Sequence, residues 1–219
     1  MRLVDGRVVY AASDLNDYLE CPHRVALNRR ALTHRIAPPD DDPTLAIIAA
    51  KGRDHERRVL DRLEGDGVAV VRIPEGDNTA RDLLHAVETT RLAMRSGAEA
   101  IYQASFLAGA WTGRADFLIR VDAPSALGTW SYEVEDTKLA INERPQFLVQ
   151  LCVYAELVAD MQGCLPHRVR AVLGDRTRME YDPRHYIAYV HAAKRRFEAA
   201  IDALDADAVP DHVSACAGG

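Results

Sequence analysis

Three β-type runs follow one another in the middle of the chain, and this succession constrains the fold more than any other feature. They are expected at residues 100–107, 113–121 and 130–137, with turns at Gly109 and across 122–128. Helical patterns precede and follow these runs, so the strands should form a mixed sheet with helices on both sides. We therefore expect an α/β fold with a helical N-terminal elaboration.

The flanking segments carry helix and hairpin signals. Ser13 is expected to cap a helix that runs to Arg30, with a break at Cys21-Pro22 because proline disrupts a helix interior. The remaining elements are expected to be helices at 45–64, 80–95, 145–160 and 184–204, short strands at 7–11 and 68–73, and a hairpin of 168–173 with 177–181.

At 219 residues the chain fits one domain, 1–219. Within it we expect a mainly helical part at 1–65, the core at 66–182, and a C-terminal helix and tail at 183–219. No apolar run approaches the ~20 residues that span a bilayer, and the N-terminus lacks the apolar centre of a signal peptide. We therefore expect no membrane partner and a cytoplasmic location.

The net charge of −6 argues mildly against extensive, sequence-independent binding of nucleic acid. Basic residues nevertheless cluster along the chain, so local basic surfaces stay open as an interpretation. Solvated helix faces of mixed charge explain any one cluster equally well. The clusters are Arg24/Arg29/Arg30/Arg35, Lys51/Arg53/Arg57/Arg58, Arg168/Arg170/Arg176/Arg178 and Lys194/Arg195/Arg196.

Asp136 and Lys138 are two residues apart at the end of the third β-type run, so they should project from the same face of the sheet. Asp116, near the start of the second run, adds another carboxylate. Two carboxylates and a lysine on adjacent strands can hold Mg²⁺ or Mn²⁺ beside a phosphate, because hard cations prefer oxygen ligands. Lys138 would orient or deprotonate the attacking water, or neutralise the transition state. Taken alone, however, an Asp-x-Lys triplet more often means a surface ion pair.

Four segments occur in a characteristic order: Gly52-Arg-Asp-His-Glu56, Gly113-Arg-Ala-Asp116, Glu133-Val-Glu-Asp-Thr-Lys138 and Gln150-Leu-Cys-Val-Tyr154. This order resembles the PD-(D/E)xK nuclease superfamily, in its RecB-like branch, which includes the Cas4 nucleases. The resemblance covers residues 13–154 and is greatest to RecB-like nucleases that are often joined to a helicase. It implies a restriction-endonuclease-like mixed sheet flanked by helices.

The resemblance also implies roles for single residues. The implied metal ligands are His55, Asp116, Asp136 and the Thr137 carbonyl, and the implied catalytic residues are Asp116, Asp136, Lys138, Gln150 and Tyr154. Glu56 should point elsewhere, because neighbouring helical residues diverge by about 100°. Glu133 and Glu135 are interpreted as solvated or supporting residues. Without the family, His55 would more often be a surface or core histidine, and Gln150 and Tyr154 could be ordinary helix residues.

Many relatives carry a [4Fe–4S] cluster held by one N-terminal cysteine and three cysteines near the C-terminus. Cys21 matches the first position and Cys216 begins the second group, whereas Cys152 and Cys164 lie elsewhere, and Cys152 is expected in the core. Such a cluster needs four thiolates, so none is expected on this chain, whether it is a fragment or has lost the cluster. As remnants of the cluster site, Cys21 and Cys216 are expected to lie near each other.

The resemblance implies a metal-dependent nuclease that hydrolyses DNA phosphodiester bonds, as an exonuclease rather than an endonuclease. Its substrate would be single-stranded or unwound DNA ends, in DNA repair, recombination or defence against mobile elements, with a helicase domain or subunit as partner. The alternative is a catalytically idle, nuclease-like module that binds DNA or docks a helicase. A third interpretation is an α/β domain whose motifs arose by chance.

Overall fold

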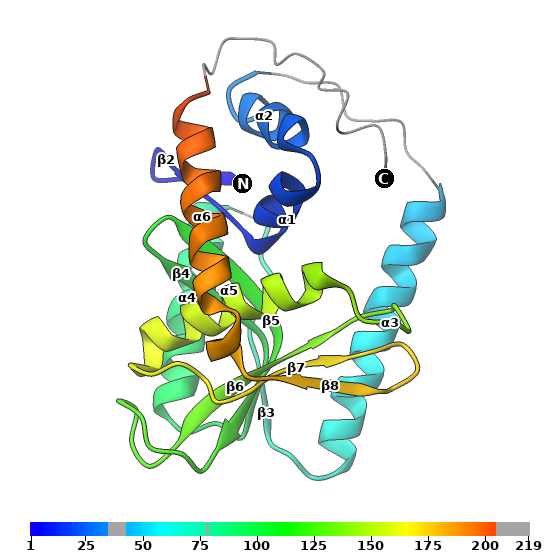
Figure 1. Cartoon of the computed structure of the whole chain (residues 1–219). Helices are drawn as coiled ribbons and strands as arrows, with labels where there is room; N and C mark the ends of the chain where they lie inside the picture. The colour runs from blue at the N-terminus through cyan, green and yellow to red at the C-terminus, as the bar shows by residue number, and fades with distance from the viewer. Residues whose placement is uncertain (35–42, 78, 205–219) are drawn as a thin grey trace.

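The computed structural model describes residues 1–34, 43–77 and 79–204, and its centre is a six-stranded sheet (Figure 1). The strands stand in sequence order from one edge of the sheet to the other. They are β3 Val70–Arg72, β4 Ala100–Ala108, β5 Trp111–Val121, β6 Ser131–Thr137, β7 Val169–Val172 and β8 Arg178–Tyr181. A separate antiparallel hairpin is formed by β1 Arg2–Val4 and β2 Arg7–Val9.

The sheet is mixed, as predicted. Strands β4, β5 and β6 are antiparallel neighbours, and β7 and β8 form an antiparallel hairpin. The pairs β3–β4 and β6–β7 are parallel, and each needs a long crossover, which contains a helix in both cases. The described part of the chain is therefore α/β, with a six-stranded mixed sheet flanked by helices.

Local signals account for several helix boundaries. The helices are α1 Ala12–Glu20, α2 Pro22–Arg30, α3 Pro43–Gly65, α4 Ala80–Arg95, α5 Pro145–Gln162 and α6 Ile187–Asp202, with a 3₁₀ turn η1 at Pro183–His185. Thr79 caps α4, because its hydroxyl accepts a hydrogen bond from the backbone N–H of Asp82 at 3.1 Å. Pro22 and Pro145 open α2 and α5 at a position where the missing N–H costs nothing.

Helices cover both faces of the sheet (Figure 1). Met94 of α4 and Leu151 of α5 belong to the main core, together with Leu118 of β5. Helix α3 covers the opposite face, where Val59 and Phe117 share a second apolar cluster. Helices α1, α2 and α6 gather beyond α5 (Figure 1). The helical N-terminal part is therefore divided, with α1 and α2 on the side of α5 and α3 on the opposite face.

The helix predicted from Ser13 to Arg30 breaks at Cys21-Pro22 as expected, but its cap is not Ser13. Helix α1 begins at Ala12 with Ala11 as its N-cap residue. The Asp14 carboxylate accepts a hydrogen bond from the Ala11 backbone N–H at 2.8 Å. The prediction was wrong because the helix begins before Ser13, which therefore lies inside the first turn, where the Asp14 side chain bonds back to the backbone of the N-cap residue.

The cysteines bear on the predicted cluster remnant. Cys152 is buried in α5, as predicted, and Cys152 and Cys164 are free thiols. Cys21 is buried at the break between α1 and α2. Cys216 lies outside the described residues, so its predicted proximity to Cys21 stays a prediction.

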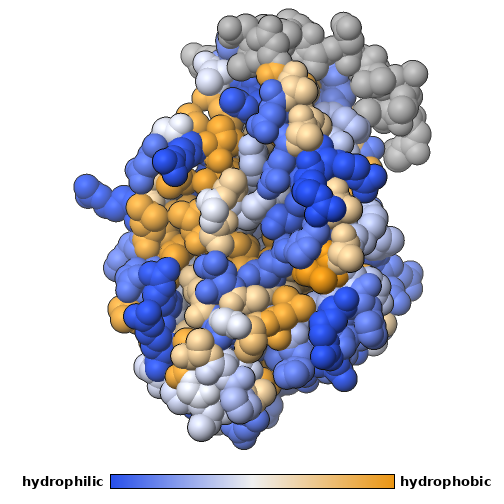
Figure 2. Space-filling model, turned by 60° about the vertical axis from the view of Figure 1, so that its left-hand side comes forward, coloured by the Kyte–Doolittle hydropathy of each residue, from blue (hydrophilic) through white to orange (hydrophobic). Residues whose placement is uncertain are grey.

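Across the three described ranges, no helix is long and apolar enough to pass through a bilayer. Figure 2 shows a face on which hydrophobic side chains gather between hydrophilic ones. Apart from what this view shows, the exposed apolar side chains include Leu45, Ile47 and Ile48 of α3, each of which is more than half exposed.

Candidate active site

The strand register brings Asp116 and Asp136 opposite each other. The β5–β6 ladder ends at Phe117 paired with Glu135, and the next pair in that register is Asp116 with Asp136. Asp136 is only 2% exposed. Burial raises the pKa of Asp116 to about 8, and the negative charges of Asp136 and Glu56 add to this shift. Two carboxylates are thus held together against their mutual repulsion.

Thr137 fixes the Asp116 carboxylate. The Thr137 backbone N–H and hydroxyl both donate to Asp116 Oδ2, at 2.7 and 2.6 Å. The structure therefore brings Thr137 to the site through its N–H and hydroxyl, whereas the carbonyl ligand implied by the resemblance stays a prediction. With one oxygen held in this way, the carboxylate has a fixed orientation beside Asp136.

Lys138 follows the last residue of β6 and turns its ammonium group back onto Asp136 Oδ2, as the two-residue spacing predicts. Its Nζ also donates to Gln150 Oε1 at 2.9 Å. The same atom lies 5.5 Å from the centre of the Phe147 ring, within the range of a cation–π contact. The lysine is therefore held between a carboxylate, an amide and an aromatic face, with 16% of its side chain exposed.

Gln150 and Tyr154 lie one turn apart on α5, and Gln150 Nε2 donates to the Tyr154 hydroxyl at 2.8 Å. Burial and the nearby charge of Asp136 raise the pKa of Tyr154. Gly113 on β5 lets α5 approach, because a Cβ there would stand 2.9 Å from the Tyr154 ring and 2.8 Å from Leu157. A chain of contacts therefore runs from Lys138 through Gln150 to Tyr154 on α5.

His55 lies near the same end of β6, and its implied role as a metal ligand stays a prediction. It is buried on α3, and its Nε2 is 3.2 Å from the Val172 carbonyl of β7. The same carbonyl accepts from the Lys138 backbone N–H at 2.8 Å. His55 thus ties α3 to the point where β6 ends, next to the predicted site.

The α3 carboxylate that acts on the acidic pair is Glu56, so the expectation that Glu56 points elsewhere was wrong. Glu56 Oε1 accepts from Gln103 Nε2, and burial together with the nearby Glu56 carboxylate raises the pKa of Tyr102 to about 12. Gln103 stands opposite Asp116 in the β4–β5 register and has a left-handed φ of 60°. A residue other than glycine adopts this backbone at a cost, and such strain collects at functional sites. The helical angle between neighbours did not predict this contact, because α3 packs on a face of the sheet, where His55 reaches β7 and Glu56 reaches β4.

The donor set partly fits a divalent cation. Asp116 and Asp136 offer the hard oxygen ligands that Mg²⁺ and Mn²⁺ prefer, and their mutual repulsion would be relieved by a bound cation. Within residues 1–34, 43–77 and 79–204, however, no three His, Cys, Asp or Glu side chains gather closely enough to hold a metal ion. The pair could therefore hold a cation as two of its ligands, while the predicted third ligand, His55, bonds to the backbone.

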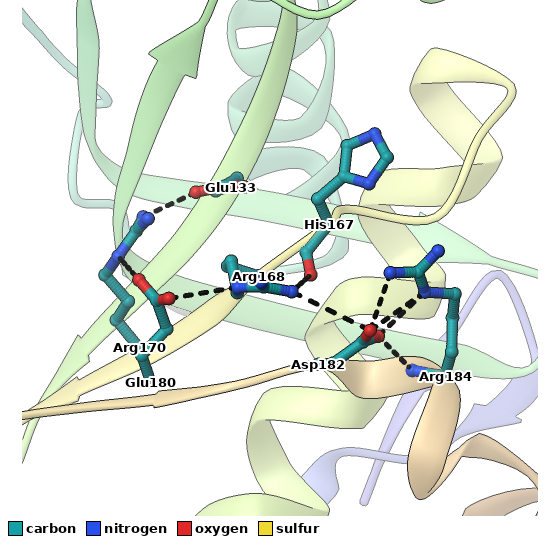
Figure 3. Close-up of polar contacts among 7 residues, drawn as sticks. All are labelled: Glu133, His167, Arg168, Arg170, Glu180, Asp182 and Arg184. Atoms are coloured by element: carbon teal, nitrogen blue, oxygen red, sulfur yellow. Dashed lines mark hydrogen bonds and ion pairs between the residues drawn. The ribbon is translucent and has the colours of Figure 1, made fainter.

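Glu133 and Glu135 are not solvated, which corrects the first part of their interpretation. Their exposed fractions are 5% and 1%. Arg170 pairs with Glu133 at 2.6 Å, as Figure 3 shows, and Arg178 pairs with Glu135 at 2.9 Å. These carboxylates therefore bind β7 and β8 to β6 and take no part in the acidic pair.

The same ion pairs explain much of one basic cluster. Glu180 forms ion pairs with Arg168 and Arg170, at 3.0 and 2.9 Å (Figure 3). Asp182 forms an ion pair with Arg184 at 2.6 Å. The guanidinium groups drawn there are thus matched by carboxylates across β6, β7 and β8. This surface is a mixed-charge network, as the second interpretation of the basic clusters expects, but it lies on the β7–β8 hairpin and not on a helix face.

No family model and no curated protein matches the sequence. A solved structure titled "Crystal structure of SSO0001" is similar at 14% sequence identity and a TM-score of 0.32. The match covers 89% of this chain and 79% of that one.

Proposed function

We propose that this protein is a metal-dependent nuclease that hydrolyses DNA phosphodiester bonds, with Asp116, Asp136 and Lys138 at its centre. The observation that carries the proposal is the facing pair of carboxylates, with a lysine held beside one of them. Such a pair costs folding free energy unless a cation or a proton compensates it. A restriction-endonuclease-like arrangement of the sheet belongs to the same proposal.

Asp116 and Asp136 would hold Mg²⁺ or Mn²⁺, which when bound polarises a phosphoryl oxygen and lowers the pKa of water. Lys138 places a positive charge beside this pair, where it can orient a water molecule or neutralise charge on the phosphate. Gln150 keeps the ammonium group in place and is itself held by Tyr154. Each of these tasks is done by a side chain whose position other contacts fix.

The proposed substrate is single-stranded or unwound DNA ends, attacked as an exonuclease, with a helicase as the proposed partner. The arginines drawn in Figure 3 are matched by carboxylates, so that face offers little free positive charge to a duplex backbone. An enzyme that acts on ends can instead bind its substrate locally, next to the acidic pair.

A second candidate is a catalytically idle module that binds DNA or docks a helicase. One observation favours it: the His55 imidazole is engaged by the Val172 carbonyl, on the backbone of β7. Against it stands the lysine, which Asp136, Gln150 and Phe147 hold beside the acidic pair.

Cleavage of labelled single-stranded DNA in Mn²⁺ separates the two candidates. We expect degradation by the unmodified protein and a loss of about 10²-fold or more in Asp136→Asn. Asp175→Asn, in the exposed β7–β8 turn, is the matched control and should cleave normally. Binding of the DNA without metal-dependent cleavage would support the idle module and would refute the nuclease.

A further inference from the structure

A cavity of about 420 Å³ opens beside Gln150 and Tyr154. Its walls come from the β1–β2 hairpin, the start of α1, the first turns of α4 and the strands β4 and β5. Its volume lies within the range of about 300–1,000 Å³ that is usual for small-molecule sites. Because two residues of the candidate active site also line it, the cavity is continuous with that site.

Two buried polar atoms in its lining lack a hydrogen-bond partner among the described residues, namely Arg114 Nε and Asn16 Oδ1. Buried polar atoms are nearly always satisfied, so two such atoms in one cavity point to a polar ligand. Asn16 is fixed in place, since its Nδ2 donates to the Gln146 carbonyl at 3.1 Å. Among the described residues, the Arg114 guanidinium pairs with Glu75 at 3.5 Å, and Glu75 is 81% exposed, so this pair is weak and leaves the guanidinium available.

The charge of the lining suits an anion. Arg2 and Arg114 bring two guanidinium groups, against the single carboxylate of Asp82. That carboxylate is already occupied, because Asp82 Oδ2 accepts from the Thr79 hydroxyl at 2.7 Å and from the Thr79 backbone N–H at 3.2 Å. A guanidinium with a free edge is the side chain best suited to bind a phosphate.

Arg114 also lies close to the acidic pair along β5. It precedes Asp116 by two residues on β5, which places the two residues about 6.6 Å apart along the strand. A phosphate bound by Arg114 and a phosphate beside Asp116 could therefore be neighbouring phosphates of one DNA strand. Val9, Leu83 and Ala86 add apolar wall to the same cavity, which suits a sugar and a base.

We propose that this cavity is a nucleotide subsite in which Arg114 binds the phosphate next to the one that is cleaved. The inference rests on the proposed nuclease function and deepens it, because it assigns the chemistry that holds the substrate. The ligand class is a nucleoside monophosphate unit, with its sugar and base against the apolar wall.

Binding is measured first, without metal. The full chain in EDTA is titrated by calorimetry with thymidine 5′-monophosphate, with thymidine and with inorganic phosphate. We expect the monophosphate to bind at least about tenfold more tightly than either of the other two probes. Thymidine binding as tightly as the monophosphate would overturn the role of Arg114, and phosphate binding as tightly would overturn the role of the apolar wall.

Two variants then test the assignment to Arg114. Arg114→Gln should weaken monophosphate binding about tenfold or more, with folding checked by circular dichroism. Arg91→Gln is the matched control, since Arg91 lies on the surface of α4 and pairs with Glu88, and it should bind as the unmodified protein does. Undiminished binding by Arg114→Gln, or no binding by the unmodified protein, overturns the proposal.

A comparison of two substrates separates failure of the subsite from failure of the nuclease. Bis(4-nitrophenyl) phosphate carries one phosphodiester and no neighbouring phosphate. In Mn²⁺, Arg114→Gln should lower kcat/KM for an oligonucleotide about tenfold, mainly through KM, and leave hydrolysis of the small diester unchanged. If both substrates lose activity equally, the subsite is wrong. If the unmodified protein hydrolyses neither substrate but binds the monophosphate through Arg114, the nuclease proposal fails and the subsite stands.

Discussion

Replacing Asp116 by Asn should make the metal-free protein more stable at neutral pH. In the folded protein the Asp116 pKa is raised from 3.8 to about 8 by burial and by the charges of Asp136 and Glu56. Between those two values the folded state keeps a proton that the unfolded chain has released, so the free energy of unfolding falls as the pH rises. The stability that this proton provides is complete below about pH 4 and is lost as the pH passes through about 8.

The magnitude follows from the linkage of protons to folding. One proton changes the free energy of unfolding by about 1.4 kcal/mol per pH unit. Between about pH 6 and about pH 7.5 the unmodified protein should therefore lose about 2 kcal/mol relative to Asp116→Asn. The amide has no charge to lose, and its oxygen can still accept the two hydrogen bonds from Thr137.

Urea denaturation in EDTA at both pH values measures the difference. Asp175→Asn is the control, because hydrogen bonds from Thr177 lower the pKa of Asp175, so this carboxylate is fully ionised throughout the interval. Saturating Mn²⁺ should remove most of the pH dependence, because the cation replaces the proton. A stability difference between Asp116→Asn and the unmodified protein that stays constant with pH would refute the reasoning.

Three further changes probe the surroundings of the site. Glu56→Gln removes one of the charges that raise the carboxyl pKa of Asp116, so the stability loss should shift to lower pH in the same denaturation series. Gly113→Ala should cost about 1–3 kcal/mol in urea denaturation and displace the α5 side chains, because the new Cβ would stand within 3 Å of them. Arg178→Ala should cost about 1–3 kcal/mol by calorimetric melting, because it leaves the buried Glu135 carboxylate without its ion-pair partner. Unchanged unfolding curves in these variants would contradict the contacts described above.

Much of the fold could be predicted because its signals are local. Thr79, Pro22 and Pro145 mark helix starts within a few residues of themselves, and the observed helices begin where they indicate. The three central strands follow from their apolar runs and from the turn at Gly109. Of hairpin β1–β2, only the second strand was predicted, because both strands are three residues long and carry little pattern.

In the candidate site, too, some contacts could be predicted from the sequence and others depend on long-range packing. Lys138 and Asp136 are two residues apart, so strand alternation predicted that they lie together. For Gln150 and Tyr154, which are four residues apart on α5, the prediction came from the resemblance and not from spacing alone. The partner of Glu56 depends on where α3 crosses the sheet, and that placement is set by packing between segments far apart in sequence. Spacing along the chain could not predict it.

The pairing of Glu135 with Arg178 depends on long-range packing in the same way, through the β6–β7–β8 register. Strand alternation indicates which way Glu135 points, but it does not show which strand will lie on that side. Its burial and its ion pair were therefore beyond prediction from the sequence.

The central claim is that Asp116 and Asp136 form a metal centre, and a Mn²⁺ titration followed by electron paramagnetic resonance tests it most directly. The unmodified protein should bind Mn²⁺, and Asp116→Asn and Asp136→Asn should each weaken that binding about tenfold or more. Lys138→Met should still bind the ion, because Lys138 contributes charge but is not a ligand. Mn²⁺ binding that survives in both aspartate variants, or that is absent from the unmodified protein, would contradict the account.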